Sequence, residues 1–193
     1  MGTNPAEKRD SYTYDDYRSF SDELRCEIID GQIYDMTPAP TTTHQSIVLR
    51  VGRLVDQYLE SRNYPCRIYL APVDVILSEK DVVQPDVFIV CDRSVIKKSG
   101  IFGAPDVVFE VISPSTEARD RKQKRDLFEQ HGVKEYFMVH PDRKFLEKYI
   151  LETGVYKKPE LYEVQDTFRI DTIQLEICMK DLFNFPTEEE SEA

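Results

Sequence analysis

The chain of 193 residues is long enough to bury a sizeable core, and its content of 40% hydrophobic and 32% charged residues is that of a globular protein. Its formal net charge of -11 argues against a surface that binds polyanions broadly, so a nucleic-acid function needs a local basic patch. No apolar run is long enough to span a membrane, and the N-terminus has no secretory signal pattern. We therefore expect a cytoplasmic protein.

Organisation along the chain predicts one domain between two polar ends. Residues 1–12 are expected to form a flexible N-terminus, residues 13–185 a single domain, and residues 186–193 a disordered acidic tail. Four cysteines are scattered singly, without a CxxC pair or a histidine at zinc-ligand spacing. We expect all four to be reduced core thiols: Cys26, Cys66, Cys91 and Cys178.

The N-terminal third predicts a short helix, a hairpin and a long helix. The aromatic residues of 11–24 suit a short helix that covers the core. Asp30-Gly31 lies between two alternating apolar runs and predicts a tight hairpin over residues 26–36. After a turn rich in proline and threonine, Thr43 caps a predicted helix from His44 to about Ser61.

The middle of the chain predicts two consecutive strands, residues 67–77 and 82–90, followed by a loop over 91–104. A strand then carries Glu110, and the break at 113–116 caps a helix that runs to about His131. Three further segments, preceded by a strand at 135–139, look like an antiparallel meander: 145–150, 155–164 and 168–177. This order predicts an α/β or α+β protein in which helices pack on a mixed sheet.

Two acids stand where a purely structural sequence would not place them. Asp86 follows Pro85 at the start of an apolar strand, and Glu110 lies inside a strand that is apolar on both faces. A carboxylate there is costly to bury, so it needs a cation, a metal ion or a proton. Asp86 could instead be a turn residue, and Asp74 precedes a similar strand.

The helix after Glu110 turns a lysine toward this pair. Asp120, Lys124 and Phe128 recur at spacings of four, which places Lys124 on the inward stripe. Carboxylates are hard ligands for Mg²⁺ or Mn²⁺, and a neighbouring ammonium can orient a water and stabilise charge on a phosphate. The combination predicts metal-dependent phosphodiester hydrolysis. Structural alternatives are a plain Glu110–Lys124 salt bridge and a lysine that reaches the surface.

Several segments together resemble the Uma-two family, a bacterial group in the restriction-endonuclease-like PD-(D/E)XK superfamily. They are Pro85-Asp86, Glu110-Val111-Ile112, Asp120-x-x-x-Lys124, Ala104-Pro105-Asp106, Ser113-Pro114-Ser115-Thr116 and Gly132-Val133-Lys134-Glu135-Tyr136. The resemblance runs from about Tyr14 to Ile150. It implies a restriction-endonuclease-like core, with helices on both sides of a mixed central β-sheet and an added antiparallel hairpin or meander.

One departure from the superfamily pattern concerns the lysine. The second motif usually reads acid, any residue, lysine on one strand, but Ile112 stands at that place. The resemblance then implies that Lys124 has taken over this role, with Asp86 and Glu110 as metal ligands. Glu27 matches the family as a further metal contact or a partner of Lys124. His44 also matches and could bond a substrate phosphate.

A basic strip beside the site could hold a nucleic-acid backbone, or be only a solvated helix face: Arg119, Arg121, Lys122 and Arg125. Asp120 is expected mainly as a partner of Lys124 at i,i+4. We expect an endonuclease with DNA preferred to RNA, and a homodimer if both strands are cut. The alternative is a binding module for nucleic acid or protein that keeps the fold without catalysis.

Overall fold

The structure, a computed structural model, describes residues 10–21, 24–36, 39–114 and 117–184. Its main sheet is mixed, with strand order β12-β11-β10-β9-β6-β3 and β13 paired to β11. The strands of this sheet are β3 (Arg67–Leu70), β6 (Val87–Val90), β9 (Val107–Val111), β10 (Glu135–His140), β11 (Phe145–Glu152), β12 (Val155–Tyr156) and β13 (Glu160–Tyr162). Among the described strand pairs of this sheet, only β9–β10 is parallel, and its connection contains the helix of the candidate site.

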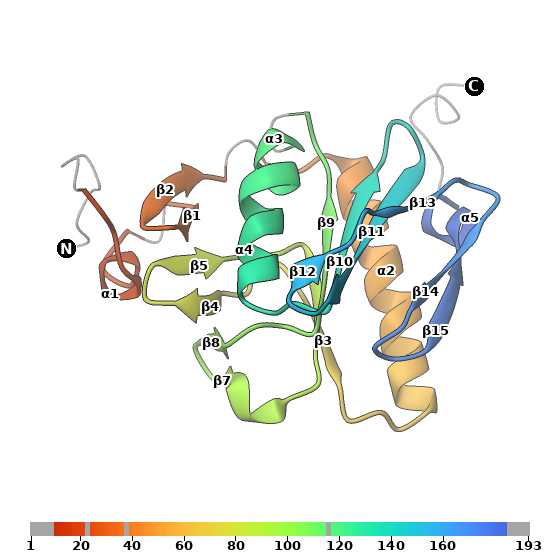
Figure 1. Ribbon diagram of the computed structural model, residues 1–193, viewed down its shortest axis with the longest axis horizontal. Coiled ribbons are helices and arrows are strands. Elements are labelled where there is room, and N and C mark those ends of the chain that lie inside the picture. Colours follow the sequence, from red (N-terminus) through yellow and green to blue (C-terminus); the bar gives the residue numbers. More distant parts are fainter. Residues whose placement is uncertain (1–9, 22–23, 37–38, 115–116, 185–193) are drawn as a thin grey trace.

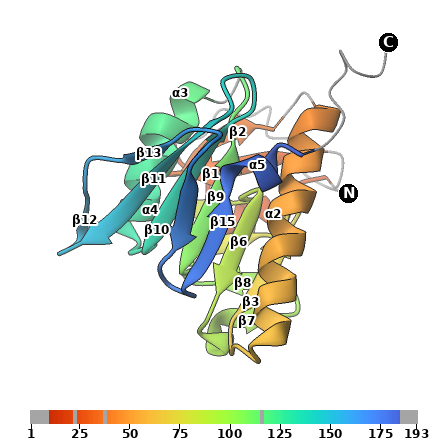
Figure 2. The same cartoon turned by 90° about the vertical axis from the view of Figure 1, so that its right-hand side faces the viewer.

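Helices cover both faces of this sheet (Figure 2). On one face α2 (Thr42–Ser61) packs together with the hairpin of β14 (Thr167–Ile170) and β15 (Leu175–Cys178) and with α5 (Met179–Leu182). On the other face lies the broken helix formed by α3 (Glu117–Arg119), a π-helical turn (Asp120–Lys124) and α4 (Arg125–Gln130). Alternation along the strands explains the two layers, because on β6, β9 and β10 odd residues such as Phe109 pack in the layer of α2 and even ones such as Val108 pack in the layer of α4.

A second sheet lies beside the first and has the order β2-β1-β5-β4-β8-β7 (Figure 1). Its strands are β1 (Cys26–Ile29), β2 (Gln32–Asp35), β4 (Val75–Ser78), β5 (Asp81–Val83), β7 (Ile96–Lys97) and β8 (Gly100–Phe102). The predicted hairpin at Asp30-Gly31 is confirmed: both residues have positive φ, as a tight turn between twisted strands requires. Tyr12 and the short helix α1 (Tyr14–Tyr17) pack on the outer face of this sheet.

The two long strands expected over 67–77 and 82–90 are each divided in two. The first predicted strand is divided into β3 and β4, and the second into β5 and β6. β3 pairs with β6 in the main sheet, and β4 pairs with β5 in the second sheet. Pro72 and Pro85 lie at the two breaks, where a residue without an N–H cannot continue a ladder. The prediction of two continuous strands was therefore wrong. Asp86 lies at the second break, where the chain passes from β5 of the second sheet to β6 of the main sheet.

Other boundaries also differ from the predictions. The segment 91–104, expected as a loop, contains a 3₁₀ turn (Arg93–Val95) and strands β7 and β8. The third strand expected for the meander is a separate two-stranded hairpin, β14–β15. The cap of α2 is Thr41, whose side chain accepts from the N–H of His44, and not Thr43. The expected tail at 186–193 lies outside the described residues.

Two cysteines that we expected to be reduced form a disulfide. Cys66 precedes β3 and Cys91 follows β6, and Arg67 pairs with Val90 in the antiparallel register. Continuing that register by one residue places the two cysteines opposite each other, although 25 residues separate them along the chain. Sequence spacing alone does not show this pairing. Cys26 and Cys178 are free thiols, and only Cys26 is buried.

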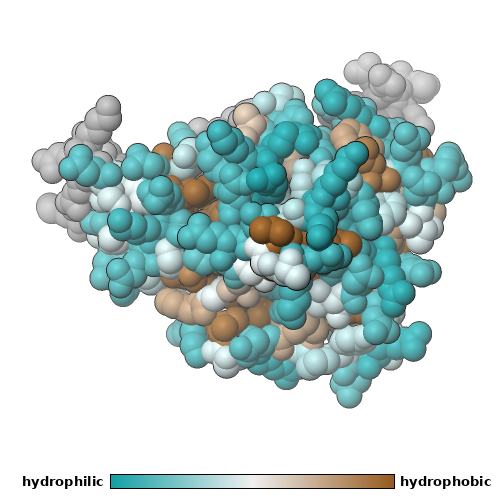
Figure 3. Space-filling model, viewed as in Figure 1, coloured by the Kyte–Doolittle hydropathy of each residue, from teal (hydrophilic) through white to brown (hydrophobic). Residues whose placement is uncertain are grey.

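The outer surface is mainly hydrophilic on the face shown in Figure 3, with small apolar patches between charged groups. Large apolar side chains that are exposed stand singly: Leu49, Phe102, Val155 and Leu161. Among the described residues, no helix is both long and apolar enough to cross a membrane.

Candidate active site

Neighbouring strands of the main sheet bring Asp86 and Glu110 together. Val87 pairs with Phe109 in the antiparallel register of β6 and β9, and continuing it by one residue places Asp86 opposite Glu110. Glu110 faces the broken helix, where it meets Lys124. Asp86 is held in place because its Oδ2 accepts from the Val111 N–H at 2.8 Å and lies 3.0 Å from His44 Nε2. In the structure, His44 therefore contacts the carboxylate of Asp86, whereas the sequence predicted a contact to a substrate phosphate.

Glu27 enters the site from the second sheet, at the middle of β1. Its residue is fully buried, and its Oε1 accepts from the Gln84 N–H at 3.0 Å. Its Oε2 is also buried and has no hydrogen-bond partner among the residues that the structure describes. Since an unpaired buried carboxylate oxygen is costly, this atom marks a position where a donor or a cation is missing.

Lys124 connects these acids from the opposite side. Its Nζ lies 2.7 Å from Glu110 Oε1, 2.9 Å from Glu27 Oε1 and 3.8 Å from Asp120 Oδ1. The lysine side chain is only 5% exposed, which confirms the prediction that it faces inward. Lys124 ends the π-helical turn, a wider turn that is rare and often occurs at functional sites.

A cavity of about 1340 Å³ joins these groups. Of the residues predicted for the site, eight line it: Glu27, His44, Asp86, Glu110, Arg119, Asp120, Lys122 and Lys124. Apolar and small side chains such as Met36, Pro114 and Ala118 complete its walls. Ile112, at the place where the superfamily has its lysine, also lines the cavity.

The electrostatics of the site are dominated by acids. Burial raises the pKa of Glu110 well above its usual range, and Asp86, Asp120 and Glu27 add to this while Lys124 opposes it. For Lys124, burial opposes the charged form, but Glu110, Glu27 and Asp120 together raise its pKa above the ordinary value. One ammonium therefore stays charged beside the carboxyl groups of Glu110, Glu27 and Asp120.

The basic strip predicted along the helix divides between two sides. Arg119 and Lys122 line the cavity, whereas Arg121 bonds both oxygens of Glu147 at 2.6 and 3.0 Å. Arg125 forms an ion pair with Asp126 beside it in the chain. Asp74, the alternative to Asp86, accepts from Tyr17 and Gln84 side chains and does not line the cavity.

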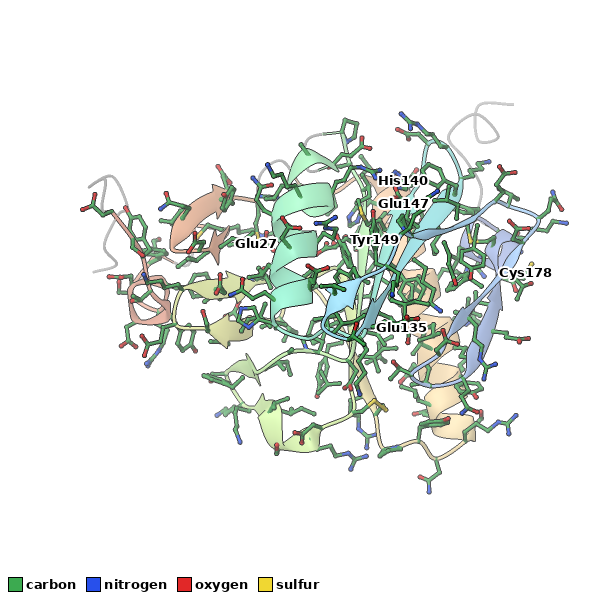
Figure 4. All side chains as sticks on the ribbon, viewed as in Figure 1. Glu27, Glu135, His140, Glu147, Tyr149 and Cys178 are labelled. Carbon is green, nitrogen blue, oxygen red and sulfur yellow. A yellow bond between two sulfur atoms is a disulfide. The ribbon has the colours of Figure 1, made fainter. Side chains whose placement is uncertain are left out.

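A second buried cluster lies outside the cavity, on β10 and β11 (Figure 4). Glu147 is bonded by His140 at 2.9 Å and by the Tyr149 hydroxyl at 3.0 Å, in addition to Arg121. Burial works against ionisation of Glu147, but these donors outweigh it and lower its pKa to about 2. Because its partners satisfy both of its oxygens, we interpret the cluster as a structural clamp between the helix and the sheet.

Sequence reasoning did not identify some residues of the site. Gln84 holds Glu27 through its backbone and Asp74 through its side chain, yet it precedes Pro85 as an ordinary polar residue. Tyr34 lines the cavity because it is the cross-strand partner of Glu27. The period-two pattern of the hairpin was a signal for this position, since partners in register share one face.

Comparisons with known proteins give a consistent result. The family model Uma2, described as "Putative restriction endonuclease", matches residues 12–180. "Uncharacterized protein slr1290" of Synechocystis sp. is 29% identical over 141 residues, which are 72% of this chain and 66% of that protein. This chain therefore spans just under two thirds of that relative's length.

A crystal structure described as a "putative nuclease belonging to DUF820", from Anabaena variabilis, has a TM-score of 0.74. It is 19% identical, and the match covers 89% of this chain and 97% of that chain. At this identity the likeness establishes the fold, and it confirms the predicted mixed-sheet, nuclease-type architecture.

Proposed function

This chain belongs to the Uma2 family, and from that premise we propose that it is an endonuclease that hydrolyses phosphodiester bonds with a divalent cation. The observation that supports this most is the position of Lys124, 2.7 Å from Glu110 in the cavity that Asp86 also lines. Two strand-borne acids and one lysine are the parts that this chemistry requires. DNA is the expected substrate before RNA, and cleavage of both strands would call for a homodimer.

The side chains of the cavity fit Mg²⁺ or Mn²⁺ by their chemistry. Asp86 and Glu110 would hold the cation, with the partnerless Oε2 of Glu27 as a further oxygen ligand. Among the described residues no three His, Cys, Asp or Glu side chains already form a metal-binding group, since Lys124 stands between Glu27 and Glu110. The cation would supply Lewis acidity toward a phosphate and an activated water.

Residues of this chain account for the other requirements. Lys124 keeps its charge, so it acts as a donor that orients water and stabilises negative charge on the phosphate, and not as a general base. His44 and the Val111 N–H hold Asp86 in one orientation. Lys122, at the wall of the cavity, is available to hold the nucleic-acid backbone, and Arg119 lies beside it as a further contact to the nucleic acid.

Replacing Asp86 with Asn tests this function directly. We expect Asp86→Asn to abolish metal-dependent cleavage of DNA while leaving thermal unfolding within a few degrees of the original protein. Calorimetric titration with Mn²⁺ should show binding to the original protein, with binding lost in Asp86→Asn and Glu110→Gln. Asp126→Asn, on the exposed part of α4, serves as the matched control and should keep both properties. Unchanged metal-dependent cleavage in Asp86→Asn would contradict the assignment.

A non-catalytic binding module is the second candidate. It is favoured by Ile112 at the usual lysine position and by the net charge of -11. Such a module would bind DNA or RNA equally well with and without Mn²⁺, and Asp86→Asn would leave the affinity unchanged. A cleavage product that requires the metal would exclude it.

A further inference from the structure

One wall of the cavity carries an arginine side chain that lies over an aromatic ring. Tyr34 of β2 pairs with Glu27 across the hairpin, so its ring lies on the cavity side of the sheet. The guanidinium of Arg119 lies over this ring, 5.6 Å from its centroid, and its Nη1 donates to the Asp35 carbonyl at 3.3 Å. Arg119 also lines the cavity. This pair therefore borders the space next to Glu27 and Lys124.

Two hydrogen-bonding atoms of the same wall are unsatisfied. Arg119 Nε and Gln123 Oε1 are buried, and neither has a hydrogen-bond partner within the described part of the chain. The two residues are four apart on the broken helix, so they lie on one side of it, and both line the cavity. One is a donor and the other an acceptor. Leaving both unpaired is costly unless a ligand completes them.

These features select the chemistry of the ligand. A phosphate offers only acceptors, so it could satisfy Arg119 but not the carbonyl of Gln123. Negative charge is also unfavourable next to Glu27, Glu110 and Asp120. The ligand must accept from Arg119, donate to Gln123 and carry no negative charge. A neutral, planar ligand with a donor and an acceptor on one edge meets these three conditions, and a nucleobase is such a ligand.

We infer that Tyr34, Arg119 and Gln123 form a subsite for one unpaired nucleobase, adjoining the proposed cleavage site. The inference depends on the proposed function only in taking nucleic acid as the ligand. A base inside a duplex is stacked on both faces and uses its hydrogen-bonding edge for its partner, so it cannot occupy this wall. The substrate class is therefore a single strand, or a duplex with a nucleotide that is unpaired or turned out of the stack.

Binding without cleavage tests the subsite. Fluorescence anisotropy would compare a short labelled DNA strand, the same strand in a duplex, and strands with one abasic position, in EDTA and in Ca²⁺. We expect the single strand to bind at least about fivefold more tightly than the duplex, because stacking of one base contributes about five- to hundredfold. An abasic position at the subsite should remove that gain.

Variants of the subsite residues test whether the preference for an unpaired base arises at this wall of the cavity. Tyr34→Leu and Gln123→Met should each weaken binding of the intact strand and cause no further loss with the abasic strand. Tyr58→Leu is the matched control, because Tyr58 also has an arginine, Arg62, over its ring but does not line the cavity. It should bind as the original protein does. Thermal unfolding confirms that each variant is folded.

Three results would overturn the subsite: equal affinity for duplex and single strand, an equal loss in Tyr34→Leu on intact and abasic strands, or no binding in either EDTA or Ca²⁺. Failure of the proposed hydrolysis is distinguishable from these. If Tyr34→Leu weakens binding of the intact strand but not of the abasic strand, and no cleavage occurs in Mg²⁺ or Mn²⁺, the subsite is supported and the proposed hydrolysis is refuted. If cleavage occurs but the variant affects both strands equally, the hydrolysis is supported and the subsite is refuted.

Discussion

At the scale of single residues, Lys124 determines the character of the cavity. It is the one ammonium among Glu27, Glu110 and Asp120, and it lies within 4 Å of each of them. A buried cation of this kind serves two purposes, because it offsets the burial of two carboxylates and remains available as a donor to a substrate. We therefore expect both the stability of the protein and the proposed cleavage to depend on it.

Replacing Lys124 should have a much larger effect than replacing an exposed lysine nearby. We expect Lys124→Met to abolish cleavage and to lower the free energy of unfolding by about 3–5 kcal/mol, because Glu27 and Glu110 remain buried without a counter-charge. Urea unfolding gives the value. Adding Glu27→Gln to the variant should recover part of the loss, whereas Lys122→Met, on the exposed side of the same turn, should change stability by less than about 0.5 kcal/mol. Stability unaffected by Lys124→Met would disprove the buried ion pair.

At the scale of elements, the broken helix is fastened on two sides. Asp120 and Lys124 turn inward from its π-helical turn, while Arg121 reaches Glu147 on β11. The turn therefore contacts the sheet at two places, through Lys124 at Glu110 of β9 and through Arg121 at Glu147 of β11. The disulfide fixes another junction, between the start of β3 and the end of β6, away from the two prolines at which the chain crosses between the sheets.

The clamp at Glu147 predicts a pH dependence of stability. Its pKa falls from 4.5 to about 2 on folding, because its bonds to His140 and Arg121 outweigh the effect of burial. A lowered pKa contributes stability above pH 4.5, and this contribution is lost as the pH falls toward 2. We expect the stability difference between the original protein and Glu147→Gln to shrink by about 2 kcal/mol across this interval.

Chemical denaturation at a series of pH values measures this difference. Glu152→Gln, an exposed acid on the same strand with a surface partner in Lys157, provides the control and should show no such trend. A difference for Glu147→Gln that stays constant from pH 5 to pH 2 would contradict the lowered pKa.

Reduction of the disulfide should weaken the sheet without touching the cavity. Opening a loop of 25 residues is expected to cost about 3 kcal/mol, because the unfolded chain regains the entropy that the crosslink removes. Guanidinium unfolding with and without dithiothreitol gives this value. The Cys66→Ser/Cys91→Ser protein should be less stable by the same amount and indifferent to the reductant. An original protein that is equally stable in both conditions would show that the crosslink contributes nothing.

At the scale of the whole molecule, the charge of -11 limits the way in which a nucleic acid can approach. Only three basic residues besides Lys124 line the cavity among the described ones, namely Arg25, Arg119 and Lys122. Few phosphates can therefore be neutralised within the cavity. Selectivity would come from the cavity more than from overall attraction.

The salt dependence of binding measures this contribution. For a single strand whose phosphates contact about two cations, Arg25 and Lys122, the logarithm of the affinity should fall with the logarithm of salt concentration at a slope of about -1.4. We expect Lys122→Gln to reduce the slope by about 0.7, since one phosphate contact is lost. Lys158→Gln, an exposed lysine that does not line the cavity, should leave it unchanged. A slope that Lys122→Gln does not alter would place the backbone elsewhere.

The sequence by itself determined the parts of this protein that depend on local patterns. Asp30-Gly31 specified a hairpin because positive φ at both positions suits that turn. The apolar run around Glu110 specified a strand buried on both faces, and the spacing of Asp120, Lys124 and Phe128 specified which side of the helix faces inward. The family resemblance supplied the nuclease-type fold, which the comparisons confirm.

Tertiary structure alone decided which distant residues meet. Glu27 joins the site because the second sheet brings β1 against the broken helix, and His44 bonds Asp86 because α2 begins beside the start of β6. Cys66 and Cys91 are joined because the antiparallel register sets them opposite each other. Local patterns report the conformation of a few neighbouring residues. Strand register, sheet crossing at proline and the pairing of buried charges arise only when segments far apart pack into one core.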